Sequence, residues 1–593
     1  MSNSNNLRTK VVSILTLSAA GLGLLLAVIG ATMEQYQQGL TLAGIASLPL
    51  QALMLFIPRP EIVLNECRDI FYRIGAVLCG LSGVFGIIAI WLAAAGTTMS
   101  NLWTRYGRRN HVIVAGDTPF AADLSRLLKA EGQSAVHVRS EDGLLPGEQE
   151  SVEDCLRCGL SAQSLEARAG LERASALVID GGGDAETLAL ARPVLTALDR
   201  KTQAQKPHIA LRIADTVMSD QFYRLTERYR VGQSVRVSVF DENLLAARHA
   251  LDIDPLFIRA AARGQKRVHA LIVGFGDLGE KLLDQVFLTS IAGDLGDPRV
   301  TIIDRDADTC RRTFQARRPR VLDQLDISFE ALDIGTDPMI GNTAPDALKT
   351  LAKLEKADQF TAIFLALPNQ GATVRAALLI DAHRELTGQF AAPIHYRCRL
   401  AAEQEDILQQ SWLEAKADHG FIRMVVPRAK LIDTVLGRPT LDRLASQLHE
   451  ACRRGANVSV AANVPWQELS ETYRRANRRA ADHMAAKLWT IGVRHEQGEG
   501  TEEKLTAADR AKIKSVLATA REDGTLDQLA ELEHRRWCVE RFLDGWLLGK
   551  ARDNRKKIHP LLVPWEKLKK LPEELDKDRD QVTTLLKTAG RVY

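Results

Sequence analysis

A glycine-rich turn in the middle of the chain has the residue types and spacing that bind phosphate. An apolar run, Val268–Val273, precedes it, and a helical pattern follows from Glu280 to Leu288. In such a turn the first glycine makes the bend, the second admits a pyrophosphate, and the third packs helix on strand. The helix start offers N–H groups and a positive dipole end to an anion. The turn therefore predicts a nucleotide site, formed by Gly274, Gly276, Asp277, Leu278 and Gly279.

Two acidic residues extend this candidate site. A second apolar run, Val300–Ile303, ends at Asp304, which is placed to accept hydrogen bonds from ribose hydroxyls. The glycine-to-acid spacing is slightly longer than usual, and the insertion Ala292–Asp297 accounts for the surplus. Asp333 follows a third apolar strand, where such folds contact nucleotides. The bound molecule is expected to be NAD(H), another adenine nucleotide or a signalling nucleotide, while a fold that has lost its ligand is the alternative.

A second group of residues near the C-terminus combines aromatic rings with positive charges. At a spacing of three, helical periodicity brings Glu531, His534 and Trp537 onto one face. Aromatic faces beside cations stack bases and hold phosphates, so we expect a ligand site here. The alternative is that the tryptophans are core residues and the basic run is a solvated turn. The candidate residues are Glu531, His534, Trp537, Trp546, Arg552, Lys557 and His559.

The segment Leu529–Leu568 resembles the ryanodine-receptor repeat (RyR) domain. The resemblance implies a mainly α-helical domain, and the order of domains is similar to that of bacterial proteins tied to nucleotide signalling or defence. The matching residues are Ala530, Glu531, His534, Trp537, Gly545, Trp546, Gly549, Arg552, Asp553, Lys557, His559, Pro560, Leu562 and Val563, with Asp578, Leu585, Leu586 and Gly590 farther on.

An alternation of short apolar runs with helical patterns occurs twice, in residues 110–245 and 267–400. This alternation predicts two doubly wound parallel sheets of the Rossmann type, which resemble TrkA-N or RCK domains. The first unit has a degraded turn, in which Thr118 and Pro119 stand where a phosphate would approach Gly116. Its second strand ends in Arg139 rather than an acid. We therefore expect the first unit to serve assembly or coupling.

The N-terminal region contains two long apolar segments. Residues 11–33 carry no charged side chain, and a second segment, 74–96, precedes Arg105, Arg108 and Arg109. Both are long enough to cross a bilayer, and the flanking positive charges put both ends of the region inside. Residues 40–57 then form a re-entrant or interfacial element, a third crossing being the alternative. This order resembles two-span potassium channels gated by RCK domains, but no TVGYG-type filter motif occurs.

Bulk composition limits the remaining classes. The chain has 593 residues and a net charge of +3, so it predicts several domains and no nucleic-acid partner. Its eight cysteines are scattered, which indicates a reducing compartment, and the lone Cys155/Cys158 pair does not make a metal site. No separate constellation of catalytic residues accompanies the glycine turn. We therefore expect a regulator and not an enzyme, an NAD-dependent oxidoreductase being the alternative.

Together these observations predict a multidomain chain. The expected parts are a transmembrane region (1–104), two Rossmann units (110–245 and 267–400), a helical region with linker (401–508) and an RyR domain (509–593, or from near 466). The expected function is a nucleotide-responsive homo-oligomer, dimer or tetramer, of the inner membrane with cytoplasmic domains. It acts as a ligand-gated channel, and a non-conducting nucleotide-binding scaffold is the alternative.

Overall fold

The structure is a computed structural model that describes most of the chain beyond residue 108. The described ranges are 109–140, 155–199, 206–228, 235–334, 346–388, 391–397, 420–438, 442–453, 463–493 and 505–592, with isolated positions between residues 22 and 82. The chain divides into two compact units. The smaller comprises Met1–Arg108, Glu148–Leu156 and Ala167–Gly170, and the larger comprises Arg109–Gly147, Arg157–Glu166 and Leu171–Tyr593.

The expected membrane segments fall in the smaller unit. Residues 11–33, 40–57 and 74–96 lie outside the described residues, apart from isolated positions. Over the part of the chain that the structure describes, no helix combines the length and the apolarity that crossing a bilayer requires.

The first sheet has the strand order β3-β2-β1-β4-β5-β6, and the register is parallel between β2, β1, β4, β5 and β6. This order is that of a doubly wound Rossmann sheet. Its central strand reads HVIVA and is buried throughout, as expected for a parallel strand covered on both faces. The elements are β1 (His111–Ala115), α5 (Pro119–Ala130), β2 (Ala135–Arg139), β3 (Cys155–Arg157), α6 (Ala162–Ala169), η2 (Leu171–Arg173), β4 (Ala174–Ile179), α7 (Asp184–Asp199), β5 (His208–Arg212), α8 (Thr216–Arg228) and β6 (Val237–Phe240).

The second sheet repeats this order as β12-β11-β10-β7-β8-β9, with every pair parallel. The predicted doubly wound folds are therefore confirmed, but the last strand lies beyond residue 400, where the sequence placed the end of this unit. The elements are β7 (His269–Val273), α11 (Asp277–Thr289), β8 (Arg299–Asp304), α12 (Ala307–Arg317), η3 (Val321–Asp323), β9 (Asp326–Ala331), α13 (Asp346–Ala357), β10 (Ala362–Leu365), α14 (Gln370–Thr387), β11 (Ile394–Arg397) and β12 (Phe421–Met424).

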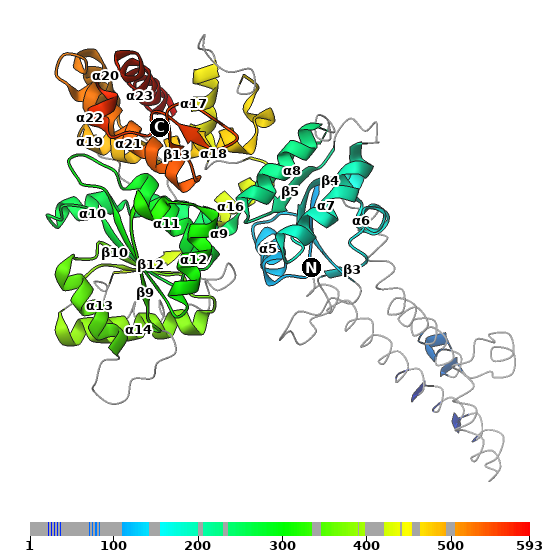
Figure 1. Cartoon of the computed structure of the whole chain (residues 1–593). Coiled ribbons are helices and arrows are strands. Elements are labelled where there is room, and N and C mark those ends of the chain that lie inside the picture. The colour runs from blue at the N-terminus through cyan, green and yellow to red at the C-terminus, as the bar shows by residue number, and fades with distance from the viewer. Residues whose placement is uncertain are drawn as a thin grey trace. The chain divides into compact units, whose positions relative to one another are not determined.

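Helices connect the sheets and form the C-terminal part, as labelled in Figure 1. The connecting elements are α9 (Glu242–Ile253), α10 (Leu256–Ala262), α16 (Arg428–Val435), α17 (Arg443–Arg453), η7 (Trp466–Glu468), α18 (Glu471–Asp482) and α19 (Met484–Thr490). The C-terminal elements are α20 (Ala507–Thr519), α21 (Thr525–Leu543), β13 (Leu547–Leu548), β14 (Ile558–His559), α22 (Trp565–Leu568) and α23 (Pro572–Val592).

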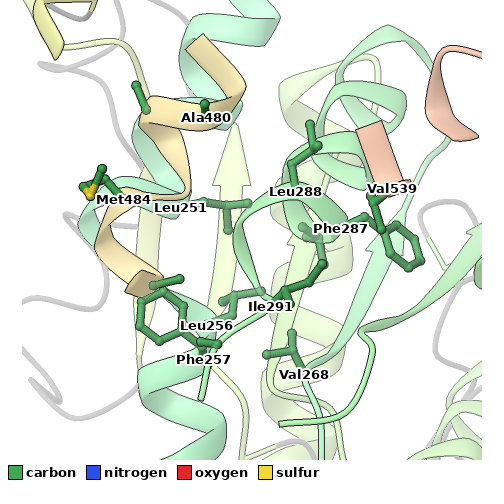
Figure 2. Close-up of a cluster of buried hydrophobic side chains, with 14 of the residues drawn as sticks. Leu251, Leu256, Phe257, Val268, Phe287, Leu288, Ile291, Ala480, Met484 and Val539 are labelled. Atoms are coloured by element: carbon green, nitrogen blue, oxygen red, sulfur yellow. The ribbon is translucent and has the colours of Figure 1, made fainter. Parts of the chain in front are cut away.

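One hydrophobic core joins the second sheet to the C-terminal helices. Figure 2 shows Met484 and Val539 of this core together with Phe287 and Leu288 of α11 and with Ile291, which follows that helix. Side chains on strand β7 alternate between this core and a second core under α13 and α14, as the pleat requires. Residues 466–490 therefore pack with the expected RyR domain, as in the alternative that this domain begins near residue 466.

The insertion Ala292–Asp297 docks these C-terminal helices. The N–H group of Gly293 donates to Thr490 Oγ1 (3.0 Å), and the Arg535 guanidinium lies 2.7 Å from Asp297 Oδ1. Gly293 has a φ of +51°, and a Cβ atom there would meet the Trp489 ring at 2.8 Å. The residues that lengthen the glycine-to-acid spacing thus have a structural role.

Candidate functional site

The three glycines of the central turn meet different surroundings. Gly274 has a φ of +92°, and a Cβ atom on it would lie 2.8 Å from the Ala366 carbonyl oxygen. A Cβ atom on Gly279 would lie 2.3 Å from the Gly274 carbonyl oxygen, because helix and strand approach closely there. At Gly276 a Cβ atom would meet nothing within 4 Å. The middle position is therefore the one that leaves room for a ligand.

The amino end of α11 is open to an anion. Its N-cap is Gly276, and no side chain caps the first-turn N–H groups. Such uncapped groups, together with the helix dipole, make an anion site. Leu278 contributes only its backbone here, because its side chain is buried in the core.

Asp304 is fixed beside the turn. Its carboxylate accepts the N–H of Phe275 (2.9 Å) through one oxygen and the N–H of Asp306 (2.9 Å) through the other. The side chain is half-buried, and each oxygen keeps a second lone pair for a ribose hydroxyl. Asp333 is half-buried just past β9, the strand that neighbours β8, so it lies at the same edge of the sheet.

The corresponding turn of the first Rossmann unit is closed by its own side chains. Thr118 caps α5 by accepting the N–H of Ala121 (3.1 Å), and its hydroxyl donates to Asp180. Arg212 Nη1 lies 3.3 Å from Asp180 Oδ1. A Cβ atom on Gly116 would lie 2.0 Å from the Asp180 carbonyl oxygen. The anion position is thus filled, in agreement with the degraded turn of the sequence.

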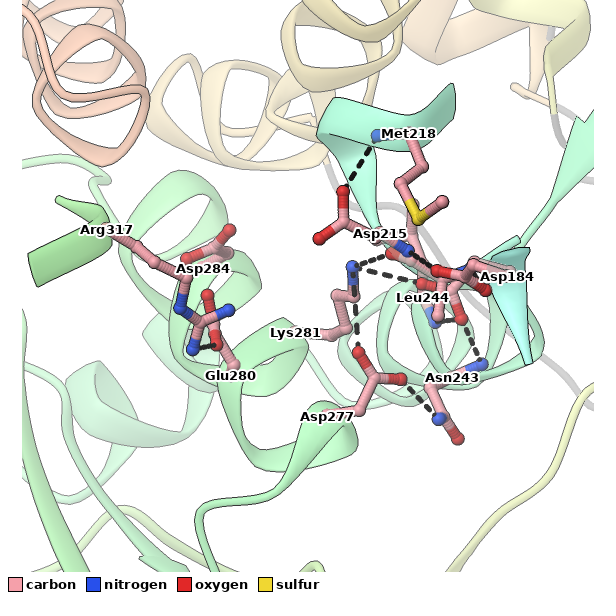
Figure 3. A network of polar contacts seen from close by, with 12 residues as sticks. Asp184, Asp215, Met218, Asn243, Leu244, Asp277, Glu280, Lys281, Asp284 and Arg317 are labelled. Carbon is pink, nitrogen blue, oxygen red and sulfur yellow. Dashed lines mark hydrogen bonds and ion pairs between the residues drawn. The ribbon is translucent and has the colours of Figure 1, made fainter. Parts of the chain in front are cut away.

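A polar network connects α11 to the first unit, as Figure 3 shows. Lys281 Nζ lies 3.1 Å from Asp241 Oδ2 and donates to the Ala214 carbonyl oxygen at 2.8 Å. Asp277 accepts a hydrogen bond from Asn243 Nδ2 (2.5 Å). Burial would lower the pKa of Lys281, but the carboxylates of Asp241 and Asp277 raise it overall. Sequence reasoning missed this lysine, because its partners are distant in the chain.

The aromatic residues of the C-terminal part form one cluster. The ring centroids of Trp537 and His559 lie 4.9 Å apart, and those of Trp546 and His559 lie 6.1 Å apart. The Arg541 guanidinium lies over both tryptophans, 5.6 Å from the Trp537 centroid and 5.3 Å from that of Trp546. Both tryptophans are half-buried, so neither is a full core residue. Arg541 was not among the residues expected at this site.

His534 has a structural position. It is only 3% exposed, lies 3.5 Å from Asp578 Oδ2, and bonds the Val563 carbonyl oxygen at 2.8 Å. Burial would lower the pKa of His534, but the hydrogen bonds to Asp578, Cys538 and Val563 raise it to about 10. The protonated ring of His534 on α21 therefore contacts the Asp578 carboxylate on α23 and links the two helices. A direct ligand contact, which the sequence suggested, does not fit this burial.

The remaining expected residues differ in exposure. Among the described residues, Glu531 is half-buried and makes no hydrogen bond or ion pair with His534 or Trp537. Arg552 and Lys557 are exposed in the turn between β13 and β14. Arg552 Nε donates to Asn554 Oδ1 (2.9 Å), and Lys557 Nζ donates to the Asp544 carbonyl oxygen (2.7 Å). Within the described ranges no group of three or more metal-ligating side chains occurs.

Comparison with known proteins identifies the C-terminal domain. Residues 512–591 match the family model of the RyR domain, so the predicted RyR domain is confirmed. No curated protein matches the chain.

Solved structures of a channel called GsuK are similar over much of the chain. The "GsuK Channel" is 14% identical with a TM-score of 0.35, and the alignment covers 72% of this chain and 98% of that one. The "GsuK channel bound to NAD" is 13% identical with a TM-score of 0.33, covering 74% and 85%. The GsuK RCK domain is 10% identical with a TM-score of 0.34, covering 57% and 80%. TM-scores this low do not support a fold assignment. The assignment of two Rossmann folds depends on the strand orders of the two sheets.

Proposed function

We propose that this protein is a nucleotide-responsive regulator whose second Rossmann unit binds an adenine nucleotide, with NAD(H) as the first candidate. One observation carries the proposal: α11 begins without a side-chain cap, beneath the open space at Gly276, and next to the Asp304 carboxylate. The pyrophosphate lies on the helix amino end and the ribose hydroxyls donate to Asp304.

Two acidic residues in the first turn of α11 would oppose an anion, and the fold neutralises both. Asp277 lies 3.9 Å from Lys281 Nζ and accepts from Asn243, and Glu280 lies 2.6 Å from Arg317 Nη2 and 2.8 Å from Arg318 Nη2. Their charges are therefore balanced locally, which leaves the helix dipole and the backbone N–H groups to attract phosphate.

Isothermal titration of the full-length chain with NAD⁺ and NADH tests this part. Gly276→Ala adds a methyl group in the open space, and Asp304→Asn removes a charged acceptor worth about 1.5–3 kcal/mol. We expect each substitution to weaken binding at least about tenfold. Gly296→Ala is the matched control, because Gly296 has an ordinary φ and only ordinary contacts around a Cβ atom. Equal affinity of the original chain and Gly276→Ala would contradict the proposal.

The second part of the proposal concerns the membrane. We infer from the uncharged segments 11–33 and 74–96 that the N-terminal region anchors a homo-oligomer in the inner membrane and forms a pore that the cytoplasmic domains gate. Reconstitution of the full-length chain in liposomes tests it. We expect NAD(H)-dependent ion flux, which Gly276→Ala abolishes. Stable membrane insertion without flux at any ligand concentration would instead support the non-conducting scaffold.

A further inference from the structure

A large cavity lies where the two Rossmann units and the C-terminal helices meet. Its volume is about 930 Å³, near the upper end for small-molecule sites. One wall consists of residues 213–220 after β5 together with the start of α9, and the next is α11. The remaining walls are α18, the end of α21 and the turn after β13. The glycine turn contributes only Asp277, so this cavity is distinct from the site proposed above.

The acidic residues along the Rossmann walls already have partners. Asp184 accepts the N–H groups of Ala214 (3.0 Å) and Asp215 (2.7 Å). Asp284 accepts from Arg318 Nη2 at 3.0 Å. Backbone N–H groups therefore stabilise the Asp184 carboxylate, and an ion pair with Arg318 neutralises Asp284.

Buried ion pairs also neutralise the side of the cavity next to α18. Arg248 lies 2.8 Å from Asp482 and 3.1 Å from Asp442. Arg478 lies 2.7 Å from Asp442. Each carboxylate faces at least one guanidinium, so these groups hold the wall together and contribute little net charge.

The RyR wall is different, because two of its three cations have no ion pair among the described residues. The third, Arg541, forms one with Glu540 Oε1, at 3.6 Å. Within the described part of the chain, Arg552 and Lys557 have no ion pair, and their hydrogen bonds go to an amide oxygen and a backbone carbonyl. Half-buried Trp546 lines the cavity beside them. This wall thus combines an aromatic face with two cations that have no ion pair among the described residues, Arg552 and Lys557, and with Arg541, which is paired with Glu540.

His559 contacts both tryptophans, and the positive charges on this wall affect its pKa. Burial and the charges of Arg552 and Arg541 lower the pKa of His559. The ring therefore stays neutral at physiological pH, and its Nδ1 accepts the N–H of Leu561 (3.2 Å). Within the described residues, Arg552 and Lys557 can therefore donate to an anion without giving up an ion pair.

We propose that this cavity is a second ligand site, which takes a nucleotide with its base against Trp546 and its phosphates on Arg541, Arg552 and Lys557. Trp546, Arg552 and Lys557 were expected at a C-terminal site. The cavity adds Arg541 and leaves out Glu531, His534, Trp537 and His559. A ligand here touches the Rossmann units as well as the RyR domain. The cavity is also lined by α11, the helix that begins at the glycine turn.

The basic turn supplies a matched pair of variants. Arg552 and Lys557 line the cavity, whereas Arg555 and Lys556 are equally exposed in the same turn and do not. Each pair is changed to glutamine in the full-length Gly276→Ala chain, in which binding at the glycine turn is weakened. Binding of ATP and of GTP is then measured by calorimetry.

We expect saturable binding of ATP or GTP in the Gly276→Ala chain, weakened at least about tenfold by Arg552→Gln/Lys557→Gln. Arg555→Gln/Lys556→Gln should leave the affinity within about twofold, since these side chains make no contact with the cavity. Absence of binding of both nucleotides, or an equal loss in both double variants, would overturn this proposal. Neither result would affect the glycine-turn proposal, which the NAD(H) titration tests separately.

Discussion

Lys281 Nζ lies 3.1 Å from Asp241 Oδ2, which joins the helix of the glycine turn to the residue that ends the first sheet. Asp241 is also the N-cap of α9 and accepts the N–H groups of Asn243 (2.9 Å) and Leu244 (3.2 Å). Both partners of the ion pair are largely buried. One short contact therefore links α11, the helix of the glycine turn, to the first Rossmann unit.

Lys281→Met should destabilise the protein strongly. It leaves the Asp241 carboxylate buried without its ammonium partner, which costs about 3–5 kcal/mol of unfolding free energy. Asp241→Asn keeps an N-cap side chain, so the double variant should recover part of this loss. Urea denaturation of the two single variants and the double variant measures the coupling.

An exposed ion pair provides the control for this cycle. Lys349 lies 3.0 Å from Asp346 on the surface of α13, and its side chain is 51% exposed. Lys349→Met should change the unfolding free energy by less than about 1 kcal/mol. A Lys281→Met effect as small as that of Lys349→Met would show that the buried pair does not join the units.

Gly279→Ala should destabilise the fold although it adds one methyl group. That group would lie 2.3 Å from the Gly274 carbonyl oxygen, so the backbone must shift at a cost of about 1–3 kcal/mol. Gly276→Ala, with open space and an ordinary φ of −80°, should leave the thermal midpoint close to that of the original chain. Thermal denaturation of both variants measures the difference, and a lower midpoint for Gly276→Ala than for Gly279→Ala would contradict the geometry of the turn.

The protonated His534 should make stability depend on pH. The folded state keeps this proton up to a pKa of about 10, whereas the unfolded chain releases it near its ordinary value of about 6.5. The stabilisation is complete below pH 6.5, and the unfolding free energy falls as the pH rises above it. The effect of His534 on the unfolding free energy can be measured by itself between about pH 6.5 and 8. Burial lowers the pKa of Lys487 to about 8, so above that pH this lysine makes the unfolding free energy rise with pH.

Asp578→Asn is the variant that isolates this effect. It removes the carboxylate that raises the pKa of His534, so the decline between pH 6.5 and 8 should become shallower. Urea midpoints at several pH values for both proteins give the two slopes. Identical slopes would show that His534 is not the source.

The sequence revealed the parts of the fold and site that depend on local patterns. The strand, glycine turn and helix at Gly276, with an acid at Asp304, form a local signal, and the structure brings them together. The RyR pattern is local in the same sense. The sixth strand of the second sheet, β12, escaped prediction because it follows residues 398–419 at a distance from its unit.

The missing parts depend on contacts between distant segments. Arg541 looks like any basic residue on a helix, and only the return of the chain through Trp546 places its guanidinium over two indole rings. His534 was expected to face a ligand, yet α23 covers it and supplies Asp578. Periodicity along α21 predicted which residues share a face of the helix, but not which residues of other segments pack against that face.

Amide hydrogen exchange at the glycine turn is the most direct test of nucleotide binding. In the full-length chain, saturating NADH should slow exchange at residues 276–280, because the proposal places the pyrophosphate on the N–H groups at the start of α11. The first turn, at residues 116–121, should be unchanged, because Thr118 and Asp180 already occupy it. Unchanged exchange at residues 276–280 under saturating NADH, or equal protection of both turns, would contradict the account.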